Sequence, residues 1–401
     1  MTTFRLMQTS ELAEAARLSD SVFRQGKQPS MGEMFPNLFA PGMPHSYGAF
    51  AEDGSLAAFM GLAPSTLRAG GAAQIGVFSI GSVCTAPEHR GVGLAGRLLE
   101  RCFAHAVKAE APLLFVSGDR SLYTRAGCSP FGSAATAVIR PLALQDSLAF
   151  RGDLHAPHSP PGLIVREART REARAENLLR LHRLHEAGST RFEESAAGFG
   201  ARLEAAAYCG VLGLTQRVIL AVIEDTPVAY AVIGVPHHVR GFTDGGAAPI
   251  PTAPDSGQPT DQPPTVISYG GEPEYAADLL ERLPGSFGLN ELHIPIPWQE
   301  RELLTYMKQA GAECRMSANA GTLFVTNVQM LLDQASPLWP RPWTEALRVE
   351  KGRVLSAASR RELQRSEWLA LLLDPDAARP DDVPSWLTPI ALPYLYGLHY
   401  T

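Results

Sequence analysis

The 401-residue sequence has little of several features that mark particular protein classes. Its five cysteines are odd in number and scattered, which excludes a secreted disulfide framework and predicts reduced core cysteines. No hydrophobic run approaches the roughly 20 residues that span a bilayer. The N-terminus also lacks the cationic start and apolar block of a secretion signal. We therefore expect a cytoplasmic protein with no membrane partner.

Positive charge is scarce as well. The sequence has 35 Lys and Arg against 41 Asp and Glu, a net charge of −6, so it carries no electrostatic footprint for nucleic acid. Hydrophobic residues make up 45% and charged residues 19%, which is enough for large cores and unlike a disordered chain. A chain of this length suits two or three domains.

Proline-rich segments divide the chain. Residues 155–162 (HAPHSPPG) predict a linker, because proline lacks the N–H that helices and sheets require. Residues 240–264 have little to bury and predict a surface insertion inside a domain. A third boundary is expected near Asn327. The domains predicted from these breaks span residues 1–152, 163–327 and 328–401.

The first two of these domains share an order of elements. Residues 49–61 and 221–234 both indicate a hairpin of apolar strands around an acidic turn, and Asp53-Gly54 is a strong hairpin signal. Upstream of each hairpin lie a strand and a helix. Downstream of each come a strand, a helix, a strand, a helix, an Ala-Gly pair and a last strand. This order predicts two related α/β domains in tandem.

A glycine-rich turn follows the strand expected at residues 77–85. Residues 91–96 spell G-x-G-x-x-G, and Asp119 lies close to the distance at which a dinucleotide fold places its ribose-binding carboxylate. A nicotinamide-dependent oxidoreductase is therefore one interpretation. That fingerprint belongs directly after the first strand of its fold, however, whereas residues 87–90 intervene here and a hairpin comes earlier.

A different register, starting at Arg90, gives the pattern R-x-x-G-x-A. Small residues at Gly91, Gly93 and Ala95 let the backbone approach a pyrophosphate closely. The helix that starts at Leu94 points free N–H groups and its positive dipole end at the phosphates. The apolar face expected for this helix consists of Leu98, Cys102, Phe103 and Val107.

This arrangement resembles the acetyl-CoA loop of the GCN5-related N-acetyltransferase (GNAT) family, in the form V-x-T-x-P-x-x-R-G-x-G-x-A. The resemblance implies that the preceding strand splays from its neighbour and offers backbone groups to pantetheine. It also implies that Tyr123, in YTRAGCSPFG, protonates the departing thiolate, since a phenol of pKa about 10 stays protonated at neutral pH. The residues implied to contact acetyl-CoA are Val83, Cys84, Thr85, Arg90, Gly91, Val92, Gly93, Leu94, Ala95, Gly96, Gly118 and Asp119.

The second repeat departs from this pattern at the equivalent place, residues 266–283. A glycine pair stands there without an arginine, and Glu272 and Glu274 would repel pyrophosphate. When the Ala-Gly pairs of the two repeats are aligned, Met307 takes the place of Tyr123. We therefore expect the second domain to keep the fold without the CoA site.

The whole architecture resembles the Eis-like (enhanced intracellular survival) acetyltransferases. That resemblance implies an α/β (α+β) fold with tandem GNAT-like domains, mixed and mostly antiparallel sheets, and a small sterol-carrier-like C-terminal α+β region. It implies a closed homo-oligomer, and it implies that the terminal carboxylate of Thr401 enters the active site as a base. Region 328–401 is short for a full sterol-carrier fold, and its one clear helix is expected at Arg360–Leu373. The tail residues that favour docking in a cleft are Tyr394, Leu395, Tyr396, Leu398, His399 and Tyr400.

The function predicted from these features is acetyl-CoA-dependent N-acetyl transfer by direct attack of a primary amine. The acceptor is expected to be a small molecule or peptide of the aminoglycoside, polyamine or lysine type. A catalytically silent CoA-binding regulatory protein is the alternative from another class, and the oxidoreductase is less favoured. No metal is expected, because His182, His185 and the pair His237-His238 lack a Cys or carboxylate at ligand spacing.

Overall fold

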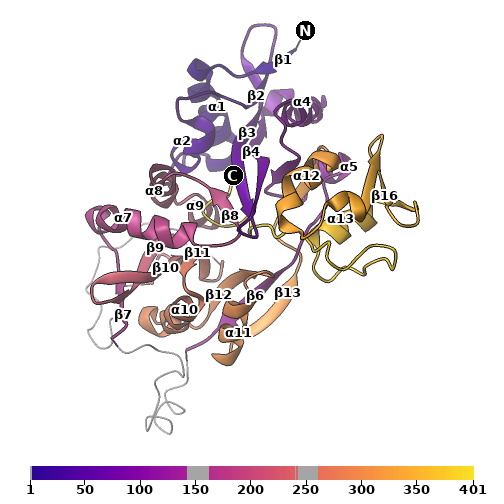
Figure 1. Ribbon diagram of the computed structural model, residues 1–401. Helices are drawn as coiled ribbons and strands as arrows, with labels where there is room; N and C mark the ends of the chain where they lie inside the picture. The colour runs from indigo at the N-terminus through magenta and orange to yellow at the C-terminus, as the bar shows by residue number, and fades with distance from the viewer. Residues whose placement is uncertain (1, 142–161, 240, 243–260) are drawn as a thin grey trace. The chain divides into compact units, whose positions relative to one another are not determined.

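The computed structural model describes residues 2–141, 162–239, 241–242 and 261–401. Nearly all of the predicted linker and most of the predicted insertion lie outside these residues. The chain divides into two compact units (Figure 1). Unit 1 comprises Met1–Gly132, Ser189–Glu194 and Ala318–Thr401, and unit 2 comprises Ser133–Gly188 and Ser195–Ser317.

A mixed sheet forms the centre of unit 1. Its strand order is β1-β2-β3-β4-β5-β14, and β8 pairs with β3 beside that path. Strands β4 and β5 are parallel and are joined through α4, whereas the other pairs are antiparallel. The strands are β1 (Thr3–Leu6), β2 (Tyr47–Phe50), β3 (Leu56–Ala69), β4 (Ala73–Thr85), β5 (Leu113–Val116), β8 (Arg191–Glu193) and β14 (Thr322–Val325).

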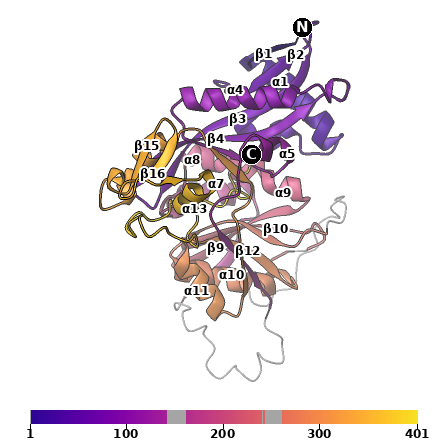
Figure 2. The same cartoon turned by 90° about the vertical axis from the view of Figure 1, so that its right-hand side faces the viewer.

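The two faces of this sheet carry different elements. Along β5, Leu114 and Val116 pack with α4, whereas Leu113 and Phe115 pack with the C-terminal residues, since side chains alternate along a strand. Figure 2 shows α4 lying across the sheet. The helices of unit 1 are α1 (Leu12–Ser19), α2 (Met31–Met34), α3 (Pro36–Phe39), α4 (Leu94–Lys108), α5 (Ser121–Arg125), α12 (Val328–Ala335) and α13 (Arg365–Leu373).

The C-terminal region shares its core with the sheet of unit 1. Leu331 of α12 and Leu372 of α13 belong to one buried cluster with Leu67 and Ile75 of the sheet. Helix α13 starts later than the helix expected from Arg360, because Arg360 has a positive φ of 61°. A small sheet precedes α13, with strands β15 (Leu347–Glu350), β16 (Arg353–Ser356) and β17 (Glu362–Leu363).

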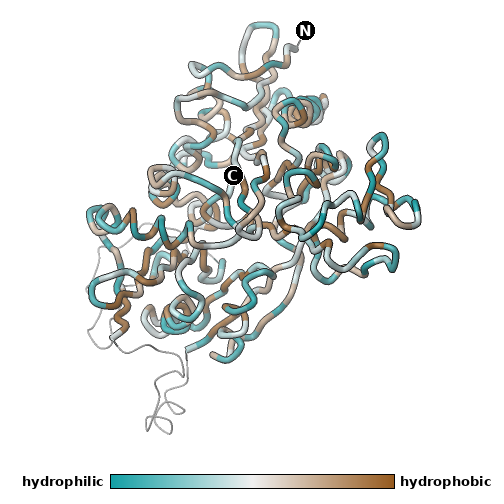
Figure 3. The backbone as a smooth tube through the Cα atoms, viewed as in Figure 1, coloured by the Kyte–Doolittle hydropathy of each residue, from teal (hydrophilic) through white to brown (hydrophobic). Residues whose placement is uncertain are grey.

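Unit 2 is built around a second mixed sheet, with strand order β13-β6-β12-β11-β10-β9-β7. Its one parallel pair, β11 and β12, is joined through α10. Hydrophobic stretches follow the strands of this sheet (Figure 3), and Ile219, Ala231 and Ile294 are fully buried. The strands are β6 (Ala134–Ile139), β7 (Ile164–Glu167), β9 (Thr215–Ile223), β10 (Thr226–Val235), β11 (Thr265–Gly271), β12 (Leu292–Pro297) and β13 (Glu313–Ser317). The helices are α7 (Arg171–Glu186), α8 (Ala196–Ala205), α9 (Ala207–Leu212), α10 (Pro273–Phe287) and α11 (Arg301–Gln309).

The compact units do not follow the boundaries expected from the proline-rich segments. Strand β6 follows the first Ala-Gly pair, yet it pairs with β12 and β13 in unit 2. Strand β14 follows the second Ala-Gly pair, yet it pairs with β5 in unit 1. The chain thus leaves unit 1 after Gly132 and returns at Ala318, ahead of the boundary expected near Asn327.

Other expectations about local structure are confirmed. The fold is mixed α/β with mostly antiparallel sheets. The predicted hairpin joins β2 to β3, and Gly54 takes the left-handed conformation in its turn, with a φ of 85°. Helix α4 begins at Leu94 as expected, but Val107 is 46% exposed and is not part of its buried face. Within the described ranges, no helix is long and hydrophobic enough to cross a bilayer.

Candidate functional site

A bulge interrupts the pairing of β3 with β4. The register shifts between Phe59 and Gly61, so that β4 carries an extra residue there. Ser82 lies in the bulge with a φ of 50°, a conformation that costs energy for a residue other than glycine. Pairing of β4 with β5 ends at Ile80 and Val116, one residue before the bulge. Strand β5 itself ends at Val116, so residues 83–85 of β4 lie beyond the β4–β5 ladder, where the resemblance implies a splay.

The glycine-rich loop joins the end of β4 to α4. Gly91 and Gly93 have φ values of 81° and 80°, and Gly93 is the N-terminal residue that precedes α4. No side chain caps this helix, so its first N–H groups are available to an anion. A Cβ added at Gly91, Gly93 or Gly96 would meet no atom within 4 Å. The glycines therefore leave open space in front of the helix.

The remaining residues of the predicted cofactor site occupy this loop and the adjacent strand ends. Arg90 is exposed, and its Nε donates a hydrogen bond of 3.3 Å to the Thr85 carbonyl. Val92 is 68% exposed, while Leu94 packs in the core beneath the loop. Gly118 follows β5, and its carbonyl accepts a hydrogen bond from Thr322. Val83 and Thr85 are half-buried, and Ala95 lies in the first turn of α4.

Tyr123 lies in α5, shortly after β5, and is only 7% exposed. Burial is the main reason why its pKa rises to about 12, and nearby Tyr400 contributes in the same direction. The phenol therefore keeps its proton at neutral pH. A buried, protonated hydroxyl can donate a hydrogen bond or a proton to an anionic leaving group.

The C-terminal tail packs into unit 1 and ends at β4. Thr401 is 6% exposed, and a Cβ built on Gly81 would overlap its carboxyl carbon and come within 2.6 Å of its Cγ2. The chain end lies beside β4 in both ribbon views (Figures 1 and 2). Tyr400 lies 6.2 Å from Phe35 and 5.3 Å from Tyr396, measured between ring centroids. The terminal carboxylate is thus held next to the bulge.

Asp119 and the tail also lie close together. The carboxylate of Asp119 contributes, after burial, to the raised pKa of Tyr396. The bulge of β4, the end of β5, Tyr123 and the tail therefore gather in one part of unit 1.

The cysteines near this site are not activated thiols. Cys84 and Cys128 are both 4% exposed, and burial raises the pKa of each thiol to about 11. Both thiols are protonated at neutral pH, which agrees with a role in packing. None of the five cysteines forms a disulfide.

The equivalent turn of unit 2 is filled. A Cβ on Gly270 would lie 2.5 Å from the Tyr230 ring, and one on Gly271 would collide with the backbone of β10. Glu272 precedes α10, and Met307 lies fully buried in the core. These glycines allow close packing of strands and leave no open space for a ligand.

The topology does not fit the dinucleotide interpretation of residues 91–96. In such a fold the glycine turn follows the first strand of a parallel sheet. Here it follows β4, which is antiparallel to β3 and comes after three earlier strands. The fold and the turn together instead define a mixed-sheet domain in which a glycine-rich loop and an uncapped helix join two parallel strands.

Comparison with known proteins gives this domain its class. Residues 3–131, which lie in unit 1, match the family model described as an acetyltransferase (GNAT) domain. No curated protein matches the sequence.

Several solved structures share the fold over most of the chain. Eis1 from Mycobacterium abscessus has a TM-score of 0.56 and 15% identity, over 91% of this chain and 85% of that one. A GCN5-related N-acetyltransferase from Anabaena variabilis has a TM-score of 0.56 and 14% identity, over 90% and 84%. A protein of unknown function from Enterococcus faecalis is described as a probable N-acyltransferase. It has a TM-score of 0.55 and 14% identity, over 83% of this chain and 75% of that one. At these identities the likeness concerns the fold alone.

Some site features were absent from the sequence prediction. These features are the left-handed conformation of Ser82, the contact of Gly81 with Thr401, and the side chains that hold the tail. The contacts with the tail join residues that are far apart in the sequence. The pair Gly81-Ser82 inside a strand was the one local signal, since glycine in a strand often marks a bulge or a close approach.

Proposed function

We propose that the protein is an acetyl-CoA-dependent N-acetyltransferase whose acceptor is a primary amine. In this proposal the loop from Arg90 to Gly96 binds the pyrophosphate of CoA. Residues Val83 to Thr85 bind the pantetheine arm and polarise the thioester carbonyl through backbone N–H groups. Tyr123 protonates the leaving thiolate, and the carboxylate of Thr401 accepts the proton of the attacking amine.

One observation carries the proposal. Glycines with open space around them precede a helix without a side-chain cap, and the same unit contains the buried chain end. The open space at Gly91, Gly93 and Gly96 would admit a diphosphate to the first N–H groups of α4. The pantetheine arm would then run along β4 beyond the end of its pairing with β5. Its thioester end would reach the bulge, where Gly81 contacts Thr401.

Acetyl-CoA supplies the acyl group, and the protein supplies position and proton transfer. Tyr123 keeps its proton until a thiolate forms, because its pKa of about 12 lies well above neutral pH. A carboxylate is a weak base in water, with a pKa near 3.5 for a chain end, so its position next to the amine matters more than its basicity.

Unit 2 is proposed to be a degenerate GNAT-like domain. Its parallel pair with a connecting helix corresponds to β4, α4 and β5 of unit 1. The filled turn at Gly270 and the buried Met307 support the absence of a CoA site there. The division into domains 1–152, 163–327 and 328–401, and the homo-oligomer, stay predictions.

The test compares two glycines in helices. Gly96 in α4 and Gly285 in α10 both have open space around a Cβ and no positive φ, so glutamate is compatible with the backbone at either position. Calorimetric titration should show acetyl-CoA binding to the wild type and to Gly285→Glu. Gly96→Glu places a carboxylate beside the pyrophosphate and should weaken binding by at least about tenfold.

The same proteins are then mixed with acetyl-CoA and a panel of primary amines, and release of the CoA thiol is followed. Transfer by the wild type, and its loss in Gly96→Glu at low acetyl-CoA, would support the proposal. Binding of acetyl-CoA without transfer to any amine would instead favour the catalytically silent regulatory protein. Equal binding by the wild type and Gly96→Glu would refute the loop assignment.

A further inference from the structure

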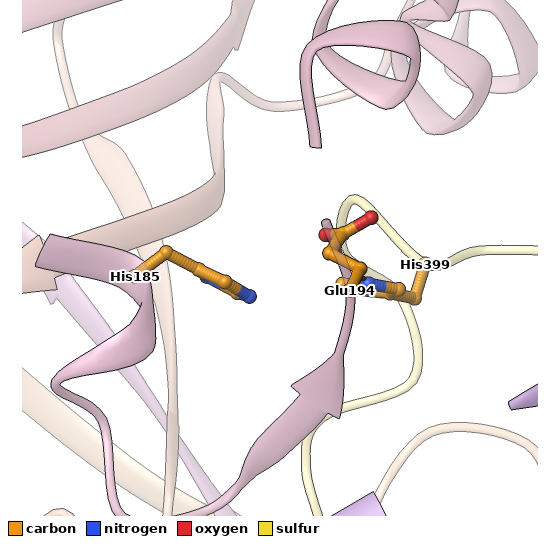
Figure 4. A group of neighbouring side chains, drawn as sticks. All are labelled: His185, Glu194 and His399. Carbon is orange, nitrogen blue, oxygen red and sulfur yellow. Dashed lines mark ion pairs between the residues drawn. The ribbon is translucent and has the colours of Figure 1, made fainter. Parts of the chain in front are cut away.

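The C-terminal tail of unit 1 contacts an acidic side chain, Glu194, two residues before the chain end. The Nε2 atom of His399 lies 2.9 Å from Oε1 of Glu194, and the side chains are 11% and 8% exposed. Figure 4 shows the two side chains together, Glu194 at the end of β8 and His399 on the tail; His185, also drawn, belongs to unit 2. Such an enclosed pair holds its partners in a narrow range of positions.

The partner is built into the sheet. Glu194 directly follows β8, whose Phe192 pairs with Leu67 of β3 and is 3% exposed. The ring of His399 stacks on Phe192, with centroids 4.6 Å apart and an interplanar angle of 27°. His399 is therefore held by two side chains of this segment, the carboxylate of Glu194 and the ring of Phe192.

Only Tyr400 separates His399 from the chain end. The Thr401 hydroxyl donates a hydrogen bond of 3.1 Å to the His399 carbonyl, which closes a tight turn. The terminal carboxyl group then rests on Gly81. A second attachment lies upstream, where buried Asn319 donates to the Pro393 carbonyl at 2.9 Å. Asn319 holds the start of the tail at Pro393. Glu194 holds His399, close to the terminal carboxylate.

We propose that Glu194 is a positioning residue for acyl transfer: its pairing with His399 holds the Thr401 carboxylate at the bulge of β4. This inference rests on the proposed function. Glu194 reaches the reaction only through the tail, and its distance in sequence from both Tyr123 and Thr401 hides it from motif analysis.

The physical basis is the cost of separating an enclosed pair. Breaking an enclosed pair by removing one partner is far more costly than losing a surface ion pair, because solvent compensates an enclosed polar group less. The released tail regains conformational freedom, and the reacting groups lose their alignment. A displacement of about 1 Å can lower a catalysed rate about a hundredfold.

The test needs a readout of tail docking that does not depend on activity. Carboxypeptidase digestion of the full chain, followed by mass spectrometry, measures the rate at which Thr401 is released. Glu194→Gln keeps the shape and removes the charge. Glu193→Gln is the matched control, because Glu193 lies next to Glu194 at the end of β8 and pairs with Arg68 of β3. We expect Thr401 to be released at least about tenfold faster from Glu194→Gln than from the control.

Kinetics on the same variants complete the test. Glu194→Gln should lower kcat at least about tenfold and leave the affinity for acetyl-CoA unchanged. In a protein that lacks residues 398–401 it should have no further effect, since it acts through the tail. His399→Phe, which keeps the stacking and removes the pair, should reproduce both changes if Glu194→Gln proves unstable.

The inference would be overturned if Glu194→Gln and His399→Phe released Thr401 at the wild-type rate. It would also be overturned if Glu194→Gln lowered kcat as much in the protein lacking residues 398–401 as in the full chain. A wild type that transfers acetyl to no amine would refute the proposed function instead. The digestion experiment would still decide whether Glu194 holds the tail.

Discussion

At the scale of single residues, Gly81 sets the position of the chain end. It is the one residue type that leaves room for Thr401 beside β4, because any Cβ there would occupy the place of the carboxyl group. Gly81→Ala should therefore displace the tail, lower acetyl transfer about a hundredfold and leave acetyl-CoA binding intact. Steady-state kinetics and calorimetry would measure these effects.

A second glycine on the same strand provides the control. A Cβ at Gly76 would lie 3.4 Å from its nearest neighbour, the carbonyl oxygen of Glu110, so Gly76→Ala should keep nearly full activity. If both variants were equally active, the tail would have no part in catalysis.

Tyr123 is the residue that we expect to matter most for the leaving group. Tyr123→Phe removes the proton donor and keeps the ring, so kcat should fall by about 10²-fold or more while acetyl-CoA affinity stays the same. Because the pKa of Tyr123 is about 12, the wild-type rate should show no loss from its ionisation below about pH 10. The control is Tyr306→Phe in α11, next to the buried Met307. A fully active Tyr123→Phe would remove this residue from the mechanism.

The positions of residues could be predicted where the pattern is local. Arg90, the loop glycines and the start of α4 lie within a few positions, and the structure has them in one turn. Gly81, Glu194 and Asn319 acquire their contacts with the tail from folding, and no spacing in the sequence indicates them. The C-terminal tail itself was visible as a cluster of aromatic residues, since such rings are unusual in a solvated end.

At the scale of elements, α4 carries a histidine cluster at the end opposite to the loop. Nε2 of His105 lies 3.2 Å from Nδ1 of His45, and Nδ1 of His105 lies 3.1 Å from the Tyr47 hydroxyl. Burial lowers the pKa of both histidines, and the neighbouring His45 and Lys108 add to the effect on His105. Neutral rings therefore join α4 to the loop before β2 and to β2 itself.

This cluster predicts how stability depends on pH. Above the unfolded pKa of about 6.5, both states are neutral at these histidines and the cluster costs nothing. As the pH falls below that value, the unfolded chain binds protons before the folded one does, so the free energy of unfolding decreases. The melting temperature should fall between about pH 7 and pH 5, and less so in His105→Gln. Exposed His238→Gln is the control, and an identical pH dependence in all three proteins would contradict the argument.

The elements themselves were largely predictable, because hydrophobic periodicity and turn residues are local signals. The hairpin at Asp53-Gly54 and the helix from Leu94 are examples. The helix expected from Arg360 begins only at Arg365, since the preceding residues pair as β17 with β16. Strand pairing of this kind depends on a partner and outweighs local helix propensity.

At the scale of the whole molecule, the chain passes from unit 1 to unit 2 just before β6 and returns to unit 1 just before β14. The sequence repeat indicated two domains, but it could not show which sheet would receive each last strand. Either sheet offers an edge for a short apolar strand, and the choice depends on the complete core. The C-terminal region likewise has no core of its own, because its buried residues belong to the cluster that includes Leu67 and Ile75.

This arrangement predicts the behaviour of a fragment. Residues 1–152 alone would lack β14, β8 and the C-terminal layer, which leaves one face of the sheet and the outer edge of β5 uncovered. The fragment should show no cooperative thermal transition and no acetyl-CoA binding, whereas the full chain shows both. Circular dichroism melting and calorimetry measure these properties. A fragment that melts cooperatively and binds acetyl-CoA would contradict the shared core.

The most direct test of the account is a crystal structure of the protein with CoA bound. We expect the diphosphate within hydrogen-bond distance of backbone N–H groups between Gly91 and Gly96, with the thiol near the Tyr123 hydroxyl and the Thr401 carboxylate. A coenzyme bound at the turn of β11 and α10, or bound in unit 1 with its diphosphate away from α4, would contradict the central claim.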